Sequence, residues 1–159
     1  MLNVNIICVG SLKEKFFTDA VSEYKKRLSR YCKFNIIELS EEKISDQETK
    51  AQIDKTLLKE GEKILSKIGK NDYCIAMCIE GKNISSEELS KKLEEISLSF
   101  GTVNFIIGGS WGLSDEVKRR ADFKLSVSKM TFPHQLFRVM LSEQIYRAFT
   151  ISSGAKYHK

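Results

Sequence analysis

The stretch that decides the fold is residues 126–149, which read SVSKMTFPHQLFRVMLSEQIYRAF. It overlaps a short apolar run, residues 123–127, that predicts a β-strand. Pro133 is the only proline in the chain and stands at the first turn of the next predicted helix, where proline is favoured. Helical spacing continues to about Thr150 in the apolar residues Leu136, Phe137, Met140, Leu141, Ile145 and Phe149. These patterns predict a strand, a polar loop and a helix in succession.

Upstream of this stretch, apolar runs that predict strands alternate with segments of helical spacing. The predicted strands are residues 4–9, 34–39, 72–79 and 103–107. Helical patterns cover residues 16–28, the charged segment 41–68, a segment opened by a Ser85/Glu88 capping box, and residues 115–120. In the charged segment, Gly61 interrupts the pattern and Gly69 is a plausible C-cap. This alternation predicts an α/β fold, with a mostly parallel sheet flanked by helices.

Length and composition bound the class of protein. A chain of 159 residues, 42% hydrophobic and 30% charged, predicts one globular domain spanning residues 1–159. No apolar run approaches the roughly 18 residues of a membrane span, and the N-terminus lacks the basic region of a signal peptide. We therefore expect a cytoplasmic protein. The cysteines Cys8, Cys32, Cys74 and Cys78 lack zinc-type spacing with the two histidines, so we expect structural thiols and no metal.

Positive charge is concentrated near the C-terminus. The chain carries a net charge of +5, yet residues 118–159 contain nine lysines and arginines against Asp122 and Glu143. The remainder is therefore slightly acidic. Such a distribution indicates a binding face for a polyanion such as RNA, rather than charge spread for solubility.

Three predicted strand ends carry loops that suit a small ligand. They are residues 80–82, 108–112 and 128–132. Ligands of open parallel sheets bind beyond the carboxyl ends of the strands, and glycines let the backbone approach them closely. The GGSWG loop fits neither a dinucleotide fingerprint nor a phosphate-binding P-loop. On the glycines alone, an ordinary strand-to-helix turn is the better interpretation.

Taken together, these motifs resemble the RlmH-type 23S rRNA pseudouridine N3-methyltransferases, a family of the SPOUT class. The similarity covers essentially the whole chain. It is carried by residues 9–10, 12–15, 80–82, 85–87, 105–110, 126–135, 143–144, 146–149 and 157–159. Departures are small: Trp111 takes a position often held by a small polar residue, and Met77 one often held by leucine.

The resemblance implies a SPOUT α/β fold whose C-terminal part, about residues 101–159, forms a trefoil knot. It also implies a cytoplasmic homodimer with the cofactor site beside the dimer interface. The implied cofactor is S-adenosyl-L-methionine, bound in a bent shape by backbone groups. Carried over by position, its binding residues are Met77, Gly108, Val127, Ser128, Lys129, Met130, Thr131 and Phe132.

The implied reaction is N3-methylation of a pseudouridine in helix 69 of 23S rRNA, in the large ribosomal subunit or the 70S ribosome. The nitrogen must lose its proton, and histidine accepts a proton near neutral pH. The proton acceptor is thus His134 or His158, with Arg138 as electrostatic support and Tyr157 as a positioning group.

Several of these residues also have a plainer interpretation. His134 suits a helix terminus, and Tyr157 and His158 lie in a tail of a kind that is usually disordered. Of Arg138 and Arg147, we expect one to meet RNA phosphate and the other a carboxylate at a subunit interface; the alternative is that both lie on a solvated helix face. Trp111 and Phe132 suit stacking on a base as well as ordinary burial.

Two other functions fit the sequence. One is a SPOUT methyltransferase that acts on tRNA. The other is a non-catalytic RNA-binding factor in ribosome assembly, which would use the basic segment alone.

Overall fold

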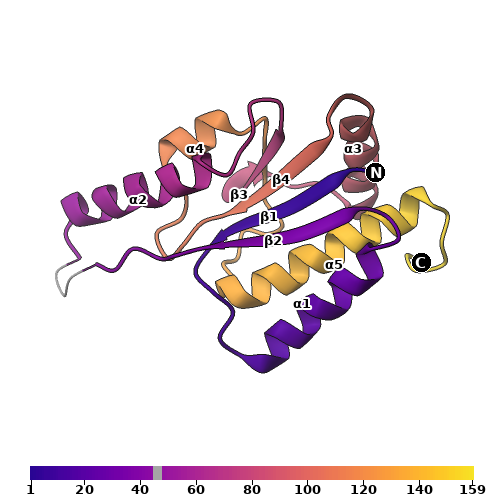
Figure 1. The fold of residues 1–159 in the computed structure, drawn as a ribbon, viewed down its shortest axis with the longest axis horizontal. Coiled ribbons are helices and arrows are strands. Elements are labelled where there is room, and N and C mark those ends of the chain that lie inside the picture. The colour runs from indigo at the N-terminus through magenta and orange to yellow at the C-terminus, as the bar shows by residue number, and fades with distance from the viewer. Residues whose placement is uncertain (45–47) are drawn as a thin grey trace.

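Five parallel strands in the order β2-β1-β4-β3-β5 form the centre of the molecule in a computed structural model that describes residues 1–44 and 48–159. Helices alternate with these strands along the chain (Figure 1). The elements are β1 (Asn3–Val9), α1 (Lys15–Leu28), β2 (Lys33–Leu39), α2 (Lys50–Leu65), β3 (Tyr73–Lys82), α3 (Ser86–Ser99), β4 (Thr102–Ile107), α4 (Asp115–Arg120), β5 (Phe123–Leu125) and α5 (His134–Ser152). The predicted α/β class with a parallel sheet is confirmed.

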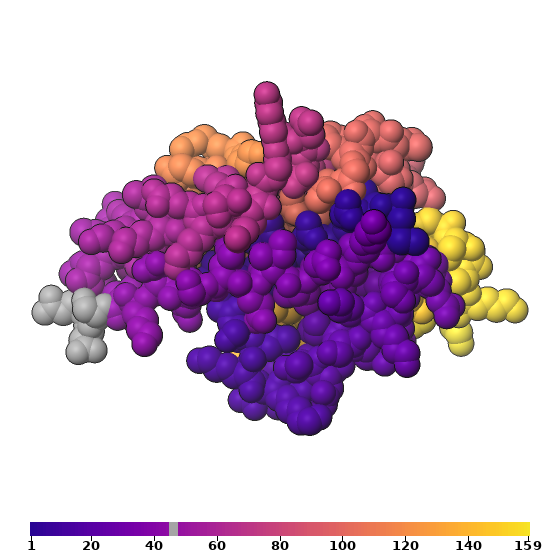
Figure 2. All heavy atoms as spheres, in the orientation of Figure 1, coloured from indigo at the N-terminus to yellow at the C-terminus, as the bar shows by residue number. Residues whose placement is uncertain are grey.

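The helices cover the two faces of the sheet unequally. On one face α1, α3 and α5 pack together, while α2 and the short α4 cover the other (Figure 1). In the same orientation, Figure 2 shows that N-terminal residues, coloured indigo and purple, hide most of α5, so that its end and the tail emerge at one edge. Alternate residues of β1 point into the two cores. Val4, Ile6 and Cys8 belong to the larger one, and Ile7 and Val9 to the smaller.

Local chemistry explains where several helices begin. The predicted capping box is present: Ser85 Oγ accepts the N–H of Glu88, and the Glu88 carboxylate accepts the N–H of Ser85. Ser114 caps α4 in the same way through the N–H of Val117. Pro133 is the N-cap of α5 rather than its first helical residue.

The charged segment differs from its prediction. The helix begins only at Lys50, and the part of the predicted pattern over residues 45–47 lies outside the described residues. Gly61 does not interrupt α2, which runs on to Leu65. Glycine stands there because a side chain would collide with Ser114, the N-cap of α4. Gly69 is not the C-cap, since α2 ends at Leu65 with Ser66 as its cap. Gly69 instead donates its N–H to Asp72, 2.8 Å away.

β3 is longer than predicted, and the last strand is shorter. Residues 80–82 belong to β3, because after an irregularity that begins at Met77 the backbone of Lys82 pairs with Leu125. β5 ends at Leu125, so Ser126 and Val127 already belong to the following loop. Among the described residues, no helix is long and apolar enough to cross a membrane.

Candidate functional site

A hollow of about 530 Å³ lies beyond the carboxyl ends of β4 and β5 and beside the second half of β3. This first hollow is lined by residues 77–80, 107–113, 118, 125–128, 130–132, 134 and 137. Seven of the eight residues predicted to bind a cofactor are among them: Met77, Gly108, Val127, Ser128, Met130, Thr131 and Phe132. Lys129 is exposed and does not line it. Its size lies within the range of small-molecule sites, roughly 300–1,000 Å³.

The wall formed by residues 108–112 depends on close contact of the backbone with itself. The N–H of Gly112 donates to the carbonyl of Gly109 at 3.0 Å, and the two residues form an isolated antiparallel bridge. Gly112 has a φ of +82°, which favours glycine. A Cβ on Gly108 would overlap the backbone of Gly112. The loop thus needs glycine at both positions, and the backbone lies open to the hollow.

The opposite wall is set by hydrogen bonds between the end of β3 and the loop after β5. Asn83 Nδ2 donates to the Ser126 carbonyl at 2.7 Å, and the Ser126 N–H donates to the Lys82 carbonyl at 3.0 Å. Within the loop, Ser126 Oγ donates to the Ser128 carbonyl, and Ser128 Oγ accepts the N–H of Met130. Sequence reasoning missed Asn83. Its position directly after β3 was the available signal.

The rim carries one ion pair and two exposed apolar side chains. Lys118 Nζ lies 2.5 Å from Glu80 Oε1, and this hydrogen bond holds the pKa of Glu80 below its ordinary value. Trp111 and Met130 are 39% and 75% exposed. Neither is buried as a core residue, so both are available to a ligand or to another macromolecule.

His134 stands at the edge of the first hollow, on the first residue of α5. Desolvation and the charge of Arg138 lower its pKa, while Glu41 acts in the opposite direction more weakly. The imidazole is therefore neutral over more of the acid range than a free histidine.

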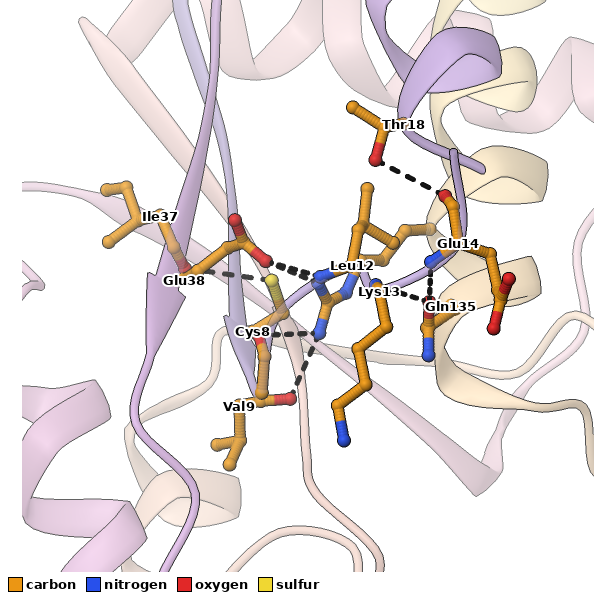
Figure 3. A network of polar contacts seen from close by, with 11 residues as sticks. Cys8, Val9, Leu12, Lys13, Glu14, Thr18, Ile37, Glu38 and Gln135 are labelled. Carbon is orange, nitrogen blue, oxygen red and sulfur yellow. Dashed lines mark hydrogen bonds and ion pairs between the residues drawn. The ribbon is translucent and has the colours of Figure 1, made fainter. Parts of the chain in front are cut away.

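Arg138 does not line the first hollow; its side chain is 1% exposed. Its Nη2 donates to the carbonyls of Val9 and Gly10 at 3.0 and 2.8 Å, and its Nη1 lies 3.0 Å from Glu38 Oε2. The Leu12 N–H donates to the same carboxylate oxygen at 2.8 Å, as Figure 3 shows together with the rest of this network. The arginine thus joins α5 to the end of β1 and is not a solvated surface residue.

The C-terminal tail packs against α3 and α5. Tyr157 Oη donates to Glu143 Oε1 at 3.1 Å, and Arg147 also contacts that oxygen. His158 Nε2 lies 2.8 Å from Glu87 Oε1, and its Nδ1 lies 3.2 Å from Arg147 Nη1. Desolvation and the charge of Glu143 raise the pKa of Tyr157 to about 12. Tyr157 and His158 are thus held in place, but neither lines the first hollow.

A second hollow, which sequence reasoning missed, lies beside this tail. It has a volume of about 520 Å³ and is lined by residues 24, 84–85, 89, 125–127, 139–141 and 143–144. Leu125, Ser126 and Val127 line both hollows and form the wall between them. Tyr157 does not line the second hollow, but it donates a hydrogen bond to Glu143, which does.

Much of the C-terminal charge is neutralised within the chain. Five of the nine cations in residues 118–159 make ion pairs: Lys118, Arg119, Arg120, Arg138 and Arg147. The other four, Lys124, Lys129, Lys156 and Lys159, have exposed side chains. The basic face predicted from charge counting is therefore narrower than the count indicates.

The cysteines occupy the positions expected of structural thiols. All four are free; Cys8, Cys32 and Cys74 are buried, and Cys78 is partly buried. Burial raises the pKa of Cys8 to about 11 and that of Cys32 to about 12, which makes both poor nucleophiles. In the part of the chain that the structure describes, no cluster of three histidine, cysteine or acidic side chains is arranged to hold a metal ion.

Comparison with known proteins gives consistent matches over the full length. The family described as "Predicted SPOUT methyltransferase" matches residues 2–158. Proteins named ribosomal RNA large subunit methyltransferase H are 54% identical in Clostridium acetobutylicum and 50% identical in Leuconostoc mesenteroides; each match covers 99% of this chain and 100% of the relative. Among solved structures, a probable methylase family protein from Haemophilus influenzae matches with a TM-score of 0.56 at 12% identity, over 98% of this chain and 70% of that one. That last likeness concerns the fold alone.

Proposed function

Because the chain belongs to the SPOUT methyltransferase family, we propose that it transfers a methyl group from S-adenosylmethionine to a base of large-subunit ribosomal RNA. One observation carries the proposal: the relatives named for this activity are 50–54% identical over their whole length. The first hollow adds support, since it gathers seven of the eight residues to which the family resemblance assigns the donor.

The residues around the first hollow fit such a donor. The backbone of residues 108–112 offers amide and carbonyl groups to the adenine and ribose, and the loop of residues 126–132 closes the opposite side. The apolar side chains of Met77, Leu125 and Phe132 supply the contacts that an adenine ring needs. Lys129 points to solvent, so only its backbone is suited to a role in binding. When bound, the donor supplies an electrophilic methyl group on a sulfonium centre.

For the acceptor, we propose N3 of a pseudouridine in helix 69 of 23S rRNA, on the assembled ribosome. The N3 proton passes to His134 or to His158. His134 lines the first hollow, and the charge of Arg138 gives electrostatic support by favouring the deprotonated form of the pseudouridine imide, while it also lowers the pKa of His134. Tyr157 positions His158 through an ion pair that both residues contact. Tyr157 donates a hydrogen bond to Glu143, Glu143 pairs with Arg147, and Arg147 contacts His158. Positioning supplies much of the acceleration.

We further propose a cytoplasmic homodimer. Three exposed apolar residues line the first hollow: Trp111, Val127 and Met130. A second copy that covers Val127 and Met130 would remove apolar surface from water next to the donor site. It would also bring a second set of exposed lysines to a shared RNA surface. Light scattering of the purified chain tests this, and a monomer at micromolar concentration would contradict it.

Two measurements test the function itself. Calorimetry with S-adenosylmethionine should give a 1:1 complex per chain, and failure to bind at millimolar donor would exclude the enzyme in favour of a non-catalytic RNA-binding factor. Methyl transfer is then compared on 70S ribosomes, free 23S rRNA and tRNA. We expect the highest rate of methyl transfer on 70S ribosomes. A higher rate on tRNA would instead identify a SPOUT methyltransferase whose substrate is tRNA.

A further inference from the structure

Glu60 of α2 is a buried carboxyl group that the proposed reaction does not use. Glu60 is only 3% exposed to solvent. Oε2 accepts the N–H of Glu42 at 3.3 Å. For Oε1, no hydrogen-bond partner exists among the residues that the structure describes. Burial of a polar atom without a partner is costly, so its place in the fold calls for a physical reason.

The carboxyl group lies against the back of the first hollow. A Cβ built on Gly109 would stand 3.0 Å from Glu60 Oε1 and 3.3 Å from Oε2. Gly109 lines the hollow, whereas Glu60 does not. The carboxyl group therefore packs on the side of Gly109 that faces away from the ligand space.

Neighbouring contacts hold the same loop from the same direction. Gly61, the next residue of α2, packs so closely on Ser114 that a Cβ there would collide with it. Ser110 Oγ donates to Glu41 Oε1 at 3.2 Å. The loop that forms one wall of the hollow is thus supported along its length by α2 and by the segment after β2.

The electrostatic surroundings of Glu60 agree with a role that depends on its shape rather than on its charge. Desolvation raises the pKa of Glu60, and the charges of Glu41 and Glu42 act in the same direction. The Glu42 N–H and the charge of Lys63 oppose the shift. A raised pKa favours the neutral carboxyl form, which is the cheaper one to bury against a backbone.

We propose that Glu60 is a positioning residue. By packing against Gly109 it fixes the position of that backbone in the wall of the first hollow, and it thereby sets the affinity for the methyl donor. This inference rests on the proposed donor binding. Glu60 touches neither donor nor acceptor; it acts through Gly109. Because Gly109 does not have a positive φ, alanine is acceptable to its backbone, and the nearest atoms to a side chain there are Glu60 Oε1 at 3.0 Å and Val9 Cγ1 at 3.2 Å.

A double-mutant cycle tests the inference, with calorimetry of S-adenosylmethionine on the full chain. Gly109→Ala alone should weaken donor affinity about tenfold, because the added methyl group forces Glu60 or the loop to move. Glu60→Ala alone should also weaken it, since the loop loses its support. In the Glu60→Ala background, Gly109→Ala should cost less than about twofold. Equal losses in both backgrounds would overturn the inference.

Three further variants separate position from other causes. Val9 Cγ1 would also lie 3.2 Å from a Cβ at Gly109, so rescue of Gly109→Ala by Val9→Ala instead of Glu60→Ala would count against Glu60. Glu60→Gln keeps the shape and should retain donor affinity within about threefold; a loss as large as that of Glu60→Ala would mean that charge, not shape, is the cause. Glu62→Ala, on the exposed side of the same helix, is the matched control and should change nothing.

Thermal unfolding without donor completes the test. Glu60→Ala and Gly109→Ala should both still unfold cooperatively, so that a weaker affinity is not the result of an unfolded chain. A wild-type chain that binds no donor would overturn the proposed function together with this inference. Donor binding with additive losses in the cycle would overturn this inference alone.

Discussion

The first and second hollows share the wall of Leu125, Ser126 and Val127, yet they are built from different parts of the fold. The first is formed mainly by loops at strand ends, where glycines expose backbone groups. The second is formed by side chains of α1, α3 and α5, with the Glu143–Arg147 pair and the tail beside it. Backbone walls suit recognition of one fixed ligand, and side-chain walls suit charge and proton chemistry. On the proposed function, the first hollow suits the donor and has His134 at its edge, whereas the second lies beside the cluster of Tyr157 and His158.

The largest expected effect is on the backbone wall. Gly108→Ala would place a Cβ into the backbone of Gly112, so we expect donor affinity to fall by more than about 100-fold. Gly101→Ala is the matched control, because a Cβ there meets nothing within 4 Å. Calorimetry of both variants checks the prediction. Near wild-type donor binding by Gly108→Ala would remove the first hollow as the donor site.

A change in the side-chain cluster should separate the two hollows. His158→Ala removes the contacts with Glu87 and Arg147, so we expect methyl transfer to RNA to fall roughly 10- to 100-fold. Donor affinity should stay within about twofold, because the tail does not line the first hollow. Ser153→Ala, exposed and uncharged at the start of the same tail, is the control. Equal loss of donor affinity and transfer would show that the two hollows act as one site.

Arg138 connects α5 to β1, and its loss should appear in stability. Arg138→Met leaves the carbonyls of Val9 and Gly10 without this donor and frees Glu38, which is partly hydrated. We expect the free energy of unfolding in urea to fall by about 2–3 kcal/mol. Arg119→Met breaks an exposed pair and should change it by less than about 0.5 kcal/mol. Similar values for the two variants would contradict the structural role of Arg138.

The smallest effect concerns pH. The pKa of His134 lies below its ordinary value of 6.5, because desolvation and Arg138 penalise the charged form. If His134 accepts the proton, the rate should fall to half of its plateau only below pH 6.5, the ordinary pKa of histidine. Protonation disfavours the folded state, so stability from this group is constant above pH 6.5 and is lost as the pH falls through the folded pKa. A pH–rate profile that is unchanged in His134→Gln would assign the proton acceptor elsewhere.

The strands and most helices were predictable because apolar periodicity and capping residues act locally. β1, β2, β4 and α4 lie at or within one residue of their predicted limits. Gly61 and Gly69 were misinterpreted because the reason for each glycine is a contact with a distant residue: Ser114 packs on Gly61, and Asp72 binds Gly69. The continuation of β3 through residue 82 depends on pairing with Leu125, which no local pattern reveals.

The grouping of strand-end residues around the first hollow was predictable for a related reason. Parallel strands place their carboxyl ends at one edge, so loops that follow different strands meet there whatever the distance between them in sequence. The second hollow was not predictable, since it depends on how α1, α3 and α5 pack. Glu60 was missed because its role requires a close contact with Gly109, 49 positions away in the printed sequence. The trefoil knot and the homodimer stay predictions.

The strand order also has a consequence for synthesis. β1 pairs on one side with β2, which follows closely, and on the other with β4, which begins only at Thr102. At roughly 5–20 residues per second, translation leaves that apolar edge of β1 without its partner for several seconds after β2 has emerged. A nascent chain of this protein therefore exposes an unpaired, aggregation-prone strand edge to its neighbours on a polysome. Chaperone depletion should lower the soluble yield of new chains before it affects the activity of molecules already folded.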